Sequence, residues 1–388
     1  MSTFAKRKIR MEMMKFIVSS QLLSKNLQNI SGIIAPNKSV PIVENILFTL
    51  KGNDLLLTAT DLETTMVSHV ALAQAEGEGS VAVPAKLVVE TLKTLPDVPV
   101  VFTVSENNDI EIVADSARYN FVGYESEQFP QMPEMDNAQT FTLSVQHLCN
   151  AISKTVFATG SADIRPVMGG VLCQLEPEKV IFVATDGHRM VKYEDLEAAT
   201  GLSTSIILPK KPLLQLKTIL QTVDEDIRVD FNASQVSFTV QSLTVISKLV
   251  EGRYPNYASV IPANNTNIMR VERSMMLQKL KNIFLYSSQS THQVRFSITE
   301  SELTLSAEDR ELSNKAIVKM PCHYEGEEMS IGFSSKFLQE FLMNLETPEI
   351  IFKLSHTTGP GLLFPVYAED EKVTEDIMML VMPVMLNA

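Results

Sequence analysis

The stretch FIVSSQLLSKNLQNI begins at Phe16, and FTLSVQHLCNAISKTV begins at Phe141 with the same apolar pattern. A third stretch, MRVERSMMLQKLKNI, begins at Met269. The first two lie 125 residues apart, and other landmarks keep this spacing: Asp61 and Asp186 in TATD and VATD, Lys86, Lys211 and Lys336, and Phe129 and Tyr254 before proline. Asp309 in SAED falls two residues short of it. Because one register relates separate landmarks, the sequence predicts three copies of one domain.

A repeat as long as a domain favours a ring or arc over a solenoid, whose units span about 20–50 residues. A chain of 388 residues fits three domains of ordinary size. The proline-rich stretches FPQMPEMDNAQ and YPNYASVIPANNTN close the first two copies. We expect domains at 14–134, 135–262 and 263–388. Residues 1–13 are basic, lack the apolar core of a secretory signal, and are predicted to be an unstructured leader.

Each copy has the pattern of an α+β domain with two helices and antiparallel strands. In the first helix, the apolar residues predicted to face the core are Leu22, Leu23, Leu27, Ile30 and Ile34. Segments such as Phe296–Ile298 alternate apolar and polar residues, which is typical of half-buried strands.

Several classes of protein are excluded by composition. No run of 18 apolar residues is present, so we expect no membrane span. The cysteines Cys149, Cys173 and Cys322 are scattered and odd in number, which favours reduced thiols in a cytoplasmic protein. The histidines show no metal-ligand spacing, and we predict neither a metal site nor a cofactor.

Positive charge is concentrated on the predicted helices, although the formal net charge is −13. The helices carry two acids, Glu90 and Glu340, and ten lysines: Lys25, Lys86, Lys93, Lys154, Lys210, Lys211, Lys217, Lys279, Lys281 and Lys336. Lysine can simply solvate a helix face, but acids would then be expected there equally often. The imbalance favours a helical surface that faces the phosphates of nucleic acid.

The packing distance between helices predicts the size of a ring lined by these helices. Helices pack about 8–10 Å apart, so twelve in a circle enclose a space about 35 Å across, wide enough for a DNA duplex. One chain supplies six helices and two chains would close the ring, which predicts a dimeric annulus with a basic lining.

Five motifs together resemble the bacterial DNA polymerase III beta subunit family, the β sliding clamps: MKFIVSSQLL at Met14, TATDLE, VATDGHRM, SKLVEGRYPNY and VMPVML. The resemblance runs from Met14 to Ala388. It implies a head-to-tail homodimeric ring of three-domain subunits that encircles duplex DNA without sequence preference. Such a ring is opened by a clamp loader and makes the replicative polymerase processive.

The resemblance also implies a pocket between the second and third domains, where polymerases, the loader and repair proteins dock short peptides. The matching positions are Met168, Thr185, Gly187, His188, Arg189, Met190, Pro255, Val260, Leu380, Val381, Met382, Pro383 and Val384. Met190 stands where leucine is common and Ser259 where a basic residue is frequent, and both bear on peptide preference. We expect Thr185 and Arg189 to offer the polar contacts.

The resemblance places the subunit interface at Tyr119 and Phe121 of one copy and Leu285 and Tyr286 of the other. Large apolar side chains at a subunit edge are protected by such pairing. Packing into the core of their own domain is the alternative for these residues.

Two other functions fit the sequence less well. An enzyme could use Asp186, His188 and Arg189 as an acid–base cluster, but no phosphate loop or nucleophile motif accompanies them. A sequence-specific DNA-binding regulator would need Arg, Asn or Gln on a recognition helix, whereas the helices here carry mostly lysine. We therefore predict a non-enzymatic clamp with no catalytic residue.

Overall fold

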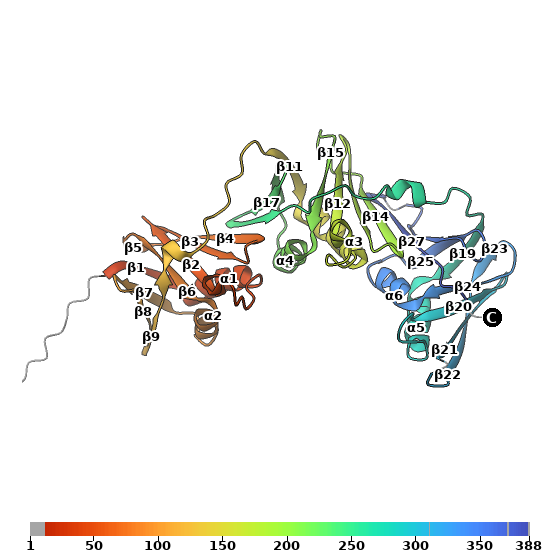
Figure 1. Ribbon diagram of the computed structural model, residues 1–388, viewed down its shortest axis with the longest axis horizontal. Helices are drawn as coiled ribbons and strands as arrows, with labels where there is room; N and C mark the ends of the chain where they lie inside the picture. Colours follow the sequence, from red (N-terminus) through yellow and green to blue (C-terminus); the bar gives the residue numbers. More distant parts are fainter. Residues whose placement is uncertain (1–11, 310, 371, 387–388) are drawn as a thin grey trace, which may run out of the picture. The chain divides into compact units, whose positions relative to one another are not determined.

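The computed structural model of the protein describes residues 12–386, apart from 310 and 371. Most of the predicted leader, residues 1–11, lies outside the described residues. The described part contains six α-helices, two in each repeat as predicted: α1 (Ser20–Ser31), α2 (Ala85–Lys93), α3 (Val145–Thr155), α4 (Lys210–Leu220), α5 (Arg273–Phe284) and α6 (Ser335–Met343) (Figure 1).

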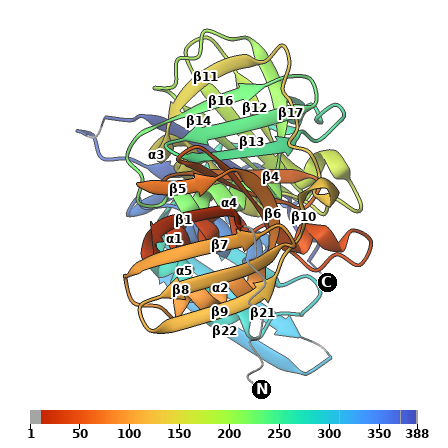
Figure 2. The same ribbon diagram turned by 90° about the vertical axis from the view of Figure 1, so that its left-hand side faces the viewer.

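The chain forms two compact units, the first being residues up to 144 together with 218–248. It contains a five-stranded antiparallel sheet in the order β5 (Gln74–Gly77), β1 (Glu12–Ser19), β7 (Pro99–Ser105), β8 (Asp109–Ala114) and β9 (Ala117–Val122) (Figure 2). A nine-stranded sheet follows the order β10 (Tyr124–Glu125), β6 (Gly79–Pro84), β2 (Asn45–Lys51), β3 (Asp54–Thr60), β4 (Thr64–Ala71), β18 (Leu243–Lys248), β17 (Gln235–Val240), β16 (Asp226–Phe231) and β11 (Gln139–Ser144).

The second unit comprises residues 145–217 and 249–388. Its nine-stranded sheet has the order β15 (Thr204–Pro209), β12 (Gly170–Leu175), β13 (Val180–Thr185), β14 (Arg189–Asp195), β27 (Glu375–Val381), β26 (Gly361–Val366), β25 (Glu349–Leu354), β19 (Asn267–Glu272) and β23 (His323–Glu325). Its four-stranded sheet has the order β22 (Asn314–Pro321), β21 (Glu302–Asp309), β20 (Gln293–Ile298) and β24 (Met329–Ser334).

Both nine-stranded sheets are joined across two repeats by the same pairing rule: the last strand of one repeat pairs with the strand after the aspartate turn of the preceding repeat. The last strand of the second repeat, β18, pairs antiparallel with β4 of the first, and the last strand of the third, β27, pairs with β14 of the second. The strands in the corresponding places, β9 of the first repeat and β22 of the third, are both edge strands of their sheets. Within the described residues, β9 and β22 therefore present two sheet edges of matching type that have no strand beside them.

Helix α1 illustrates how the local sequence specifies an element. The Ser19 hydroxyl accepts a hydrogen bond from the Leu22 N–H at 3.2 Å and caps the first turn. Leu23, Leu27 and Ile30 are fully buried, as predicted. Leu22 is exposed, so its assignment to the core was wrong: it lies next to Leu23, which takes the inward position.

Ile34 lies beyond the end of this helix and is half-buried, so it is not part of the core face either. Helix α1 packs against α2, and α5 packs against α6. None of the helices in the described ranges has the length and apolarity needed to cross a membrane.

Candidate functional site

The three aspartates of the repeat form the same turn. Asp186 Oδ1 accepts hydrogen bonds from the N–H groups of His188 (2.9 Å) and Arg189 (3.0 Å). Asp61 does the same two and three residues ahead, at 3.1 and 2.7 Å, and Asp309 at 3.0 and 3.2 Å. Since the carboxylate holds a turn in every repeat, Asp186 has a structural role.

Arg189 is fixed inside the second unit and is only 6% exposed. Its Nε donates to Asp186 at 3.1 Å, Nη1 pairs with Glu340 of α6, and Nη2 donates to the Phe157 carbonyl at 2.6 Å. The guanidinium also lies 4.3 Å from the centre of the Phe337 ring. This buried, fully engaged cation joins the turn before β14 to helix α6.

The polar contacts expected of Thr185 and Arg189 are thus taken up internally. The Thr185 hydroxyl donates to the Arg189 carbonyl at 2.7 Å and accepts from the Gly187 N–H at 3.1 Å. Both side chains are buried, so neither offers a free polar group at the surface, and that expectation was wrong. The neighbouring Gly187 has a φ of +89°, which suits the turn.

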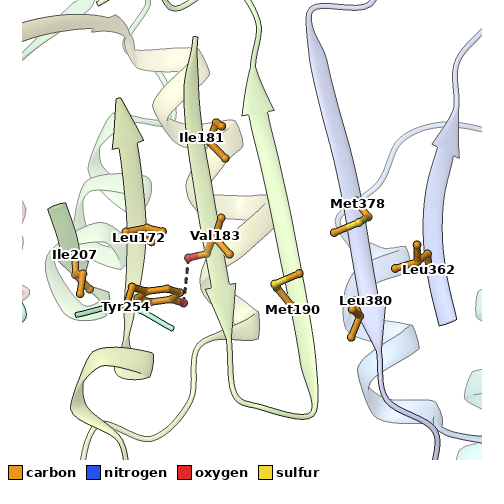
Figure 3. Close-up of a cluster of buried hydrophobic side chains, with 9 residues drawn as sticks. All are labelled: Leu172, Ile181, Val183, Met190, Ile207, Tyr254, Leu362, Met378 and Leu380. Atoms are coloured by element: carbon orange, nitrogen blue, oxygen red, sulfur yellow. Dashed lines mark hydrogen bonds between the residues drawn. The ribbon is translucent and has the colours of Figure 1, made fainter. Parts of the chain in front are cut away.

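The opposite face of the β14–β27 pair is apolar. Arg189 lies opposite Val381 and Met190 opposite Leu380, and neighbouring residues of a strand point to opposite faces. Because Arg189 contacts α6, Met190 and Leu380 lie on the face away from that helix. They belong to a buried cluster with Leu172, Ile181, Val183, Ile207, Tyr254, Leu362 and Met378 (Figure 3).

The segment between β18 and β19 lies over this apolar cluster. Val250, Tyr257 and Ile261 are partly buried and pack against it. The Tyr254 ring lies within the cluster, and its hydroxyl donates to the Val183 carbonyl at 3.2 Å (Figure 3). Burial raises the pKa of Tyr254, so its hydroxyl stays protonated and keeps this bond.

The C-terminal segment Met382–Leu386 continues from β27 beside the turn. The Met382 N–H donates to the His188 carbonyl at 2.9 Å. Met382 is exposed, whereas Pro383 and Val384 are half-buried. The turn and the tail, which are almost 200 residues apart in sequence, are therefore neighbours.

Most of the predicted pocket residues lie around this one place. His188 is exposed on the turn, and Met190 and Leu380 are in the apolar cluster. Val381 is buried on the helix-facing side instead, because it lies opposite Arg189. Met168 lies next to the turn, since a side chain added at Gly160 would contact both Met168 and Asp186.

The loop after Tyr254 differs in detail from the expectation. Pro255 is half-buried and Val260 is exposed, whereas Tyr257 and Ile261 are the residues of that loop that pack on the cluster. Strand alternation could have identified Leu172 and Val183. Tyr257 and Ile261 lie in a loop with a short 3₁₀ turn, whose periodicity the sequence does not reveal.

All ten predicted DNA-facing lysines lie on the six helices, but they are not equivalent. The exposed ones are Lys25, Lys86, Lys93, Lys211, Lys281 and Lys336, while Lys210, Lys217 and Lys279 are half-buried. Lys154 forms an ion pair with Glu375, lies 5.6 Å from the Tyr193 ring centre and is largely buried. A neutralised, buried lysine does not suit phosphate contacts.

The four predicted interface residues lie near the two sheet edges. Tyr119 and Phe121 are half-buried on the edge strand β9. Leu285, which ends α5, is 77% exposed, and Tyr286 is also exposed. Helix α5 contacts the other edge strand, β22. Core packing therefore does not account for Leu285 or Tyr286.

Comparison with known proteins identifies the chain. Models of the N-terminal, central and C-terminal domains of the DNA polymerase III beta subunit match residues 14–133, 142–256 and 258–381. The chain belongs to this family. It is a sliding clamp of the replicative DNA polymerase, a class of proteins without catalytic activity, and the acid–base alternative for Asp186 is set aside.

The similarity to relatives extends over most of the chain. The beta sliding clamp of Vibrio cholerae is 27% identical over 374 residues, covering 96% of this chain and all of the relative. That of Escherichia coli K12 is 28% identical over 346 residues, covering 89% of this chain and 94% of the relative. The Pseudomonas aeruginosa DnaN clamp, solved bound to griselimycin, superposes with a TM-score of 0.89 at 26% identity, covering 96% and 100% of the two chains.

Proposed function

We propose that two copies of this chain close into a ring around duplex DNA and tether the replicative polymerase to it. The observation that carries the proposal is the pairing rule of the sheets. A last strand pairs with the strand after the aspartate turn at two places within the chain. Pairing of β9 from one copy with β22 of another would repeat the rule a third time and close a ring head to tail.

Exposed apolar side chains mark both edges. Val122 at the end of β9 is 60% exposed, and Leu312 just before β22 is 61% exposed. In the existing junctions, the residue three after the aspartate lies opposite the same position of the last strand: Thr64 opposite Ser247, and Arg189 opposite Val381. The loop after Asp309 is two residues longer, and Asp309 pairs with Asn314, so Asn314 is the equivalent of Thr64 and Arg189 and the register places it opposite Val122.

The same register places Ala316 opposite Asn120, which allows a direct test. Opposite residues of antiparallel strands have Cβ atoms about 4.5–5.5 Å apart, close enough for a disulfide with small adjustments. Asn120→Cys together with Ala316→Cys should give covalent dimers under mild oxidation. A pair shifted by one residue, Asn120→Cys with Ile317→Cys, is the control and should crosslink poorly. Equal crosslinking of both pairs would refute the register.

The predicted interface residues support the same arrangement. Leu285 and Tyr286 lie at the end of α5, which contacts β22. Leu285→Asp with Tyr286→Asp should shift the dimer towards monomer, measured by sedimentation. A dimer that persists in this double variant would remove both residues from the interface.

We assign the lysines of the helices, other than Lys154, to the lining of the ring. Lysine contacts phosphates without reading bases, so binding should be independent of sequence and weaken with salt. Reversing Lys86, Lys211 and Lys336 to Glu should impair loading. The control reverses three exposed lysines that lie off the helices, Lys51, Lys248 and Lys372, and should leave loading intact.

We place the docking site for polymerases, the clamp loader and repair proteins at the apolar cluster and the C-terminal segment. Partner peptides should be short, with one or two anchors such as Leu or Phe and a Gln or acidic residue. Affinity should be about micromolar, since few anchors contribute. Deleting Met382–Ala388 should abolish binding and leave the dimer, and intact binding after this truncation would refute the assignment.

We further propose domain boundaries at 14–134, 135–262 and 263–388, an unstructured leader at 1–13, and a cytoplasmic location. The three family models, at 14–133, 142–256 and 258–381, lie close to these boundaries.

Topological retention on DNA tests the function as a whole. With a clamp loader and ATP, the chain should load onto nicked circular DNA and remain bound in salt that abolishes direct binding. Cutting the circle should release it. Tight, sequence-dependent binding to a short linear duplex would contradict this function and favour a regulator instead.

A further inference from the structure

The C-terminal segment Met382–Leu386 does not end at the apolar cluster but continues onto the four-stranded sheet of the third repeat. The Val384 N–H donates to the Gly332 carbonyl on β24 at 2.8 Å. The Gln293 side chain on β20 donates from Nε2 to the Met385 carbonyl at 3.1 Å. Two neighbouring strands thus hold consecutive residues of the tail.

The absence of a side chain at Gly332 makes this contact possible. A Cβ atom at this position would lie 2.4 Å from the Val384 carbonyl oxygen and 2.8 Å from a methyl carbon of Leu386. The first of these is a backbone atom, so the tail itself would have to move. Only glycine allows the tail to lie this close to β24.

Leu386 occupies a defined position on the same sheet. It lines a hollow of about 270 Å³ together with Gln293, Arg295, Ser306, Ala307, Glu308, Lys315 and Ile317. The side chain of Leu386 is half-buried, whereas Met385 next to it is 75% exposed. The alternation shows one face of the tail held by the sheet and the other open to solvent.

We infer that Gly332 and Gln293 are positioning residues for partner binding: they hold the tail on β24 and β20 and thereby fix Met382 and Pro383 beside the apolar cluster. This inference rests on the proposed docking site. The physical reason is preorganisation, because a tail that is already ordered does not lose its conformational freedom when a partner binds. At its start, beside the apolar cluster, the tail is held by the hydrogen bond from the Met382 N–H to the His188 carbonyl.

Tail release can be measured without any partner. In Gly332→Ala, the intact chain should lose its C-terminal residues to a carboxypeptidase about tenfold faster than the wild type, followed by mass spectrometry, because the backbone contact at Gly332 cannot form. Gln293→Ala removes one hydrogen bond and should accelerate trimming about fivefold. Ser330→Ala is the control, since the Ser330 hydroxyl faces that of Ser297 at 3.1 Å on the same two strands.

Partner affinity is the second measurement. A fluorescent six-residue peptide carrying Gln, Leu and Phe should bind Gly332→Ala about tenfold and Gln293→Ala about fivefold more weakly than wild type, with Ser330→Ala unchanged. If Gly332→Ala lowers the melting temperature sharply, Gln293→Ala decides. Trimming and affinity that match the wild type in Gln293→Ala would overturn the inference.

The two arms separate this inference from the function on which it rests. If the wild type binds no such peptide, the docking site is wrong, and the trimming rates still decide whether Gly332 and Gln293 hold the tail. If the tail is released by the variants but the peptide binds unchanged, the positioning role is refuted while the docking site stands.

Discussion

The pairing of β4 with β18 and the pairing of β14 with β27 have the same register but different side chains. Thr65 lies opposite Ile246 in the first, and Met190 lies opposite Leu380 in the second. Thr58 also replaces Val183, at the repeat spacing. Thr244 replaces Met378, because they pair with Val67 and Lys192, which are equivalent positions. The first junction therefore carries hydroxyl groups where the second carries an apolar face.

These hydroxyl groups are used within the first unit. Thr65 Oγ1 lies 3.0 Å from that of Thr60, and Thr244 Oγ1 lies 3.5 Å from that of Thr239. A face of paired hydroxyls has little apolar area to bury against an incoming Leu or Phe. On the proposed assignment, identical backbone pairing gives a docking surface at the second junction and a closed structural joint at the first.

Exchanging the two faces should give the largest effect. Met190→Thr with Met378→Thr makes the second junction resemble the first and should weaken binding of the fluorescent peptide about 100-fold, since each change removes about 1.5 kcal/mol of apolar contact. Fluorescence anisotropy measures the affinity, and sedimentation checks that the dimer is retained. A loss below about threefold would show that the cluster is not part of the site.

The reverse exchange sharpens the comparison. Thr58→Val, Thr65→Met and Thr244→Met give the first junction an apolar face but no C-terminal tail. We expect titration to show one peptide per chain, as in the wild type, because the tail supplies part of the site. Two peptides per chain would mean that the apolar face alone is sufficient.

The turns of the two junctions differ in the residue that adopts positive φ. Leu62 has a φ of +78° and the corresponding Gly187 a φ of +89°. A left-handed conformation costs a residue with a side chain about 1–2 kcal/mol, whereas glycine adopts it freely. In addition, a Cβ at Gly187 would lie 2.7 Å from Arg165 Nη1.

Opposite substitutions should therefore have opposite effects on stability. Gly187→Leu should lower the free energy of unfolding by about 2 kcal/mol. Leu62→Gly should raise it by about 0.5 kcal/mol, because relief of the strain exceeds the entropy that glycine costs. Urea midpoints measure both. Destabilisation by Leu62→Gly would mean that the partly exposed Leu62 side chain makes contacts that outweigh its backbone strain.

The sequence predicted what local patterns and the repeat encode. The three copies, the two helices in each, and the placement of the lysines on those helices are confirmed. The repeat spacing of 125 residues made these predictions possible, because residues at equivalent positions have equivalent structural roles.

What the sequence could not predict depends on contacts between distant segments. Lys154 looks like the other helix lysines, and only the position of Glu375 on β27 shows that it is neutralised. Arg189 looks like a surface cation in TDGHR, yet Glu340 and the Phe157 carbonyl enclose it. The position of the tail on Gly332 depends on a contact between Val384 and a strand about 50 residues earlier in the chain. No local sequence motif indicates this contact.

The last comparison concerns the hydroxyl group of Tyr254 in the apolar cluster. At the first junction the residue corresponding to Tyr254 is Phe129, which is buried without a hydroxyl. Tyr254→Phe removes the bond to the Val183 carbonyl and should cost about 1 kcal/mol.

Because burial raises the pKa of Tyr254, the folded state keeps this group neutral while the unfolded chain ionises near pH 10. The contribution is therefore complete below about pH 10 and is lost as pH rises towards the raised pKa. Between pH 9 and 11, the urea midpoint of Tyr254→Phe should fall less steeply than that of the wild type. If Tyr254→Phe and the wild type lost stability in parallel, the alkaline sensitivity would have to come from other residues, and the two junctions would not differ in their response to pH at this position.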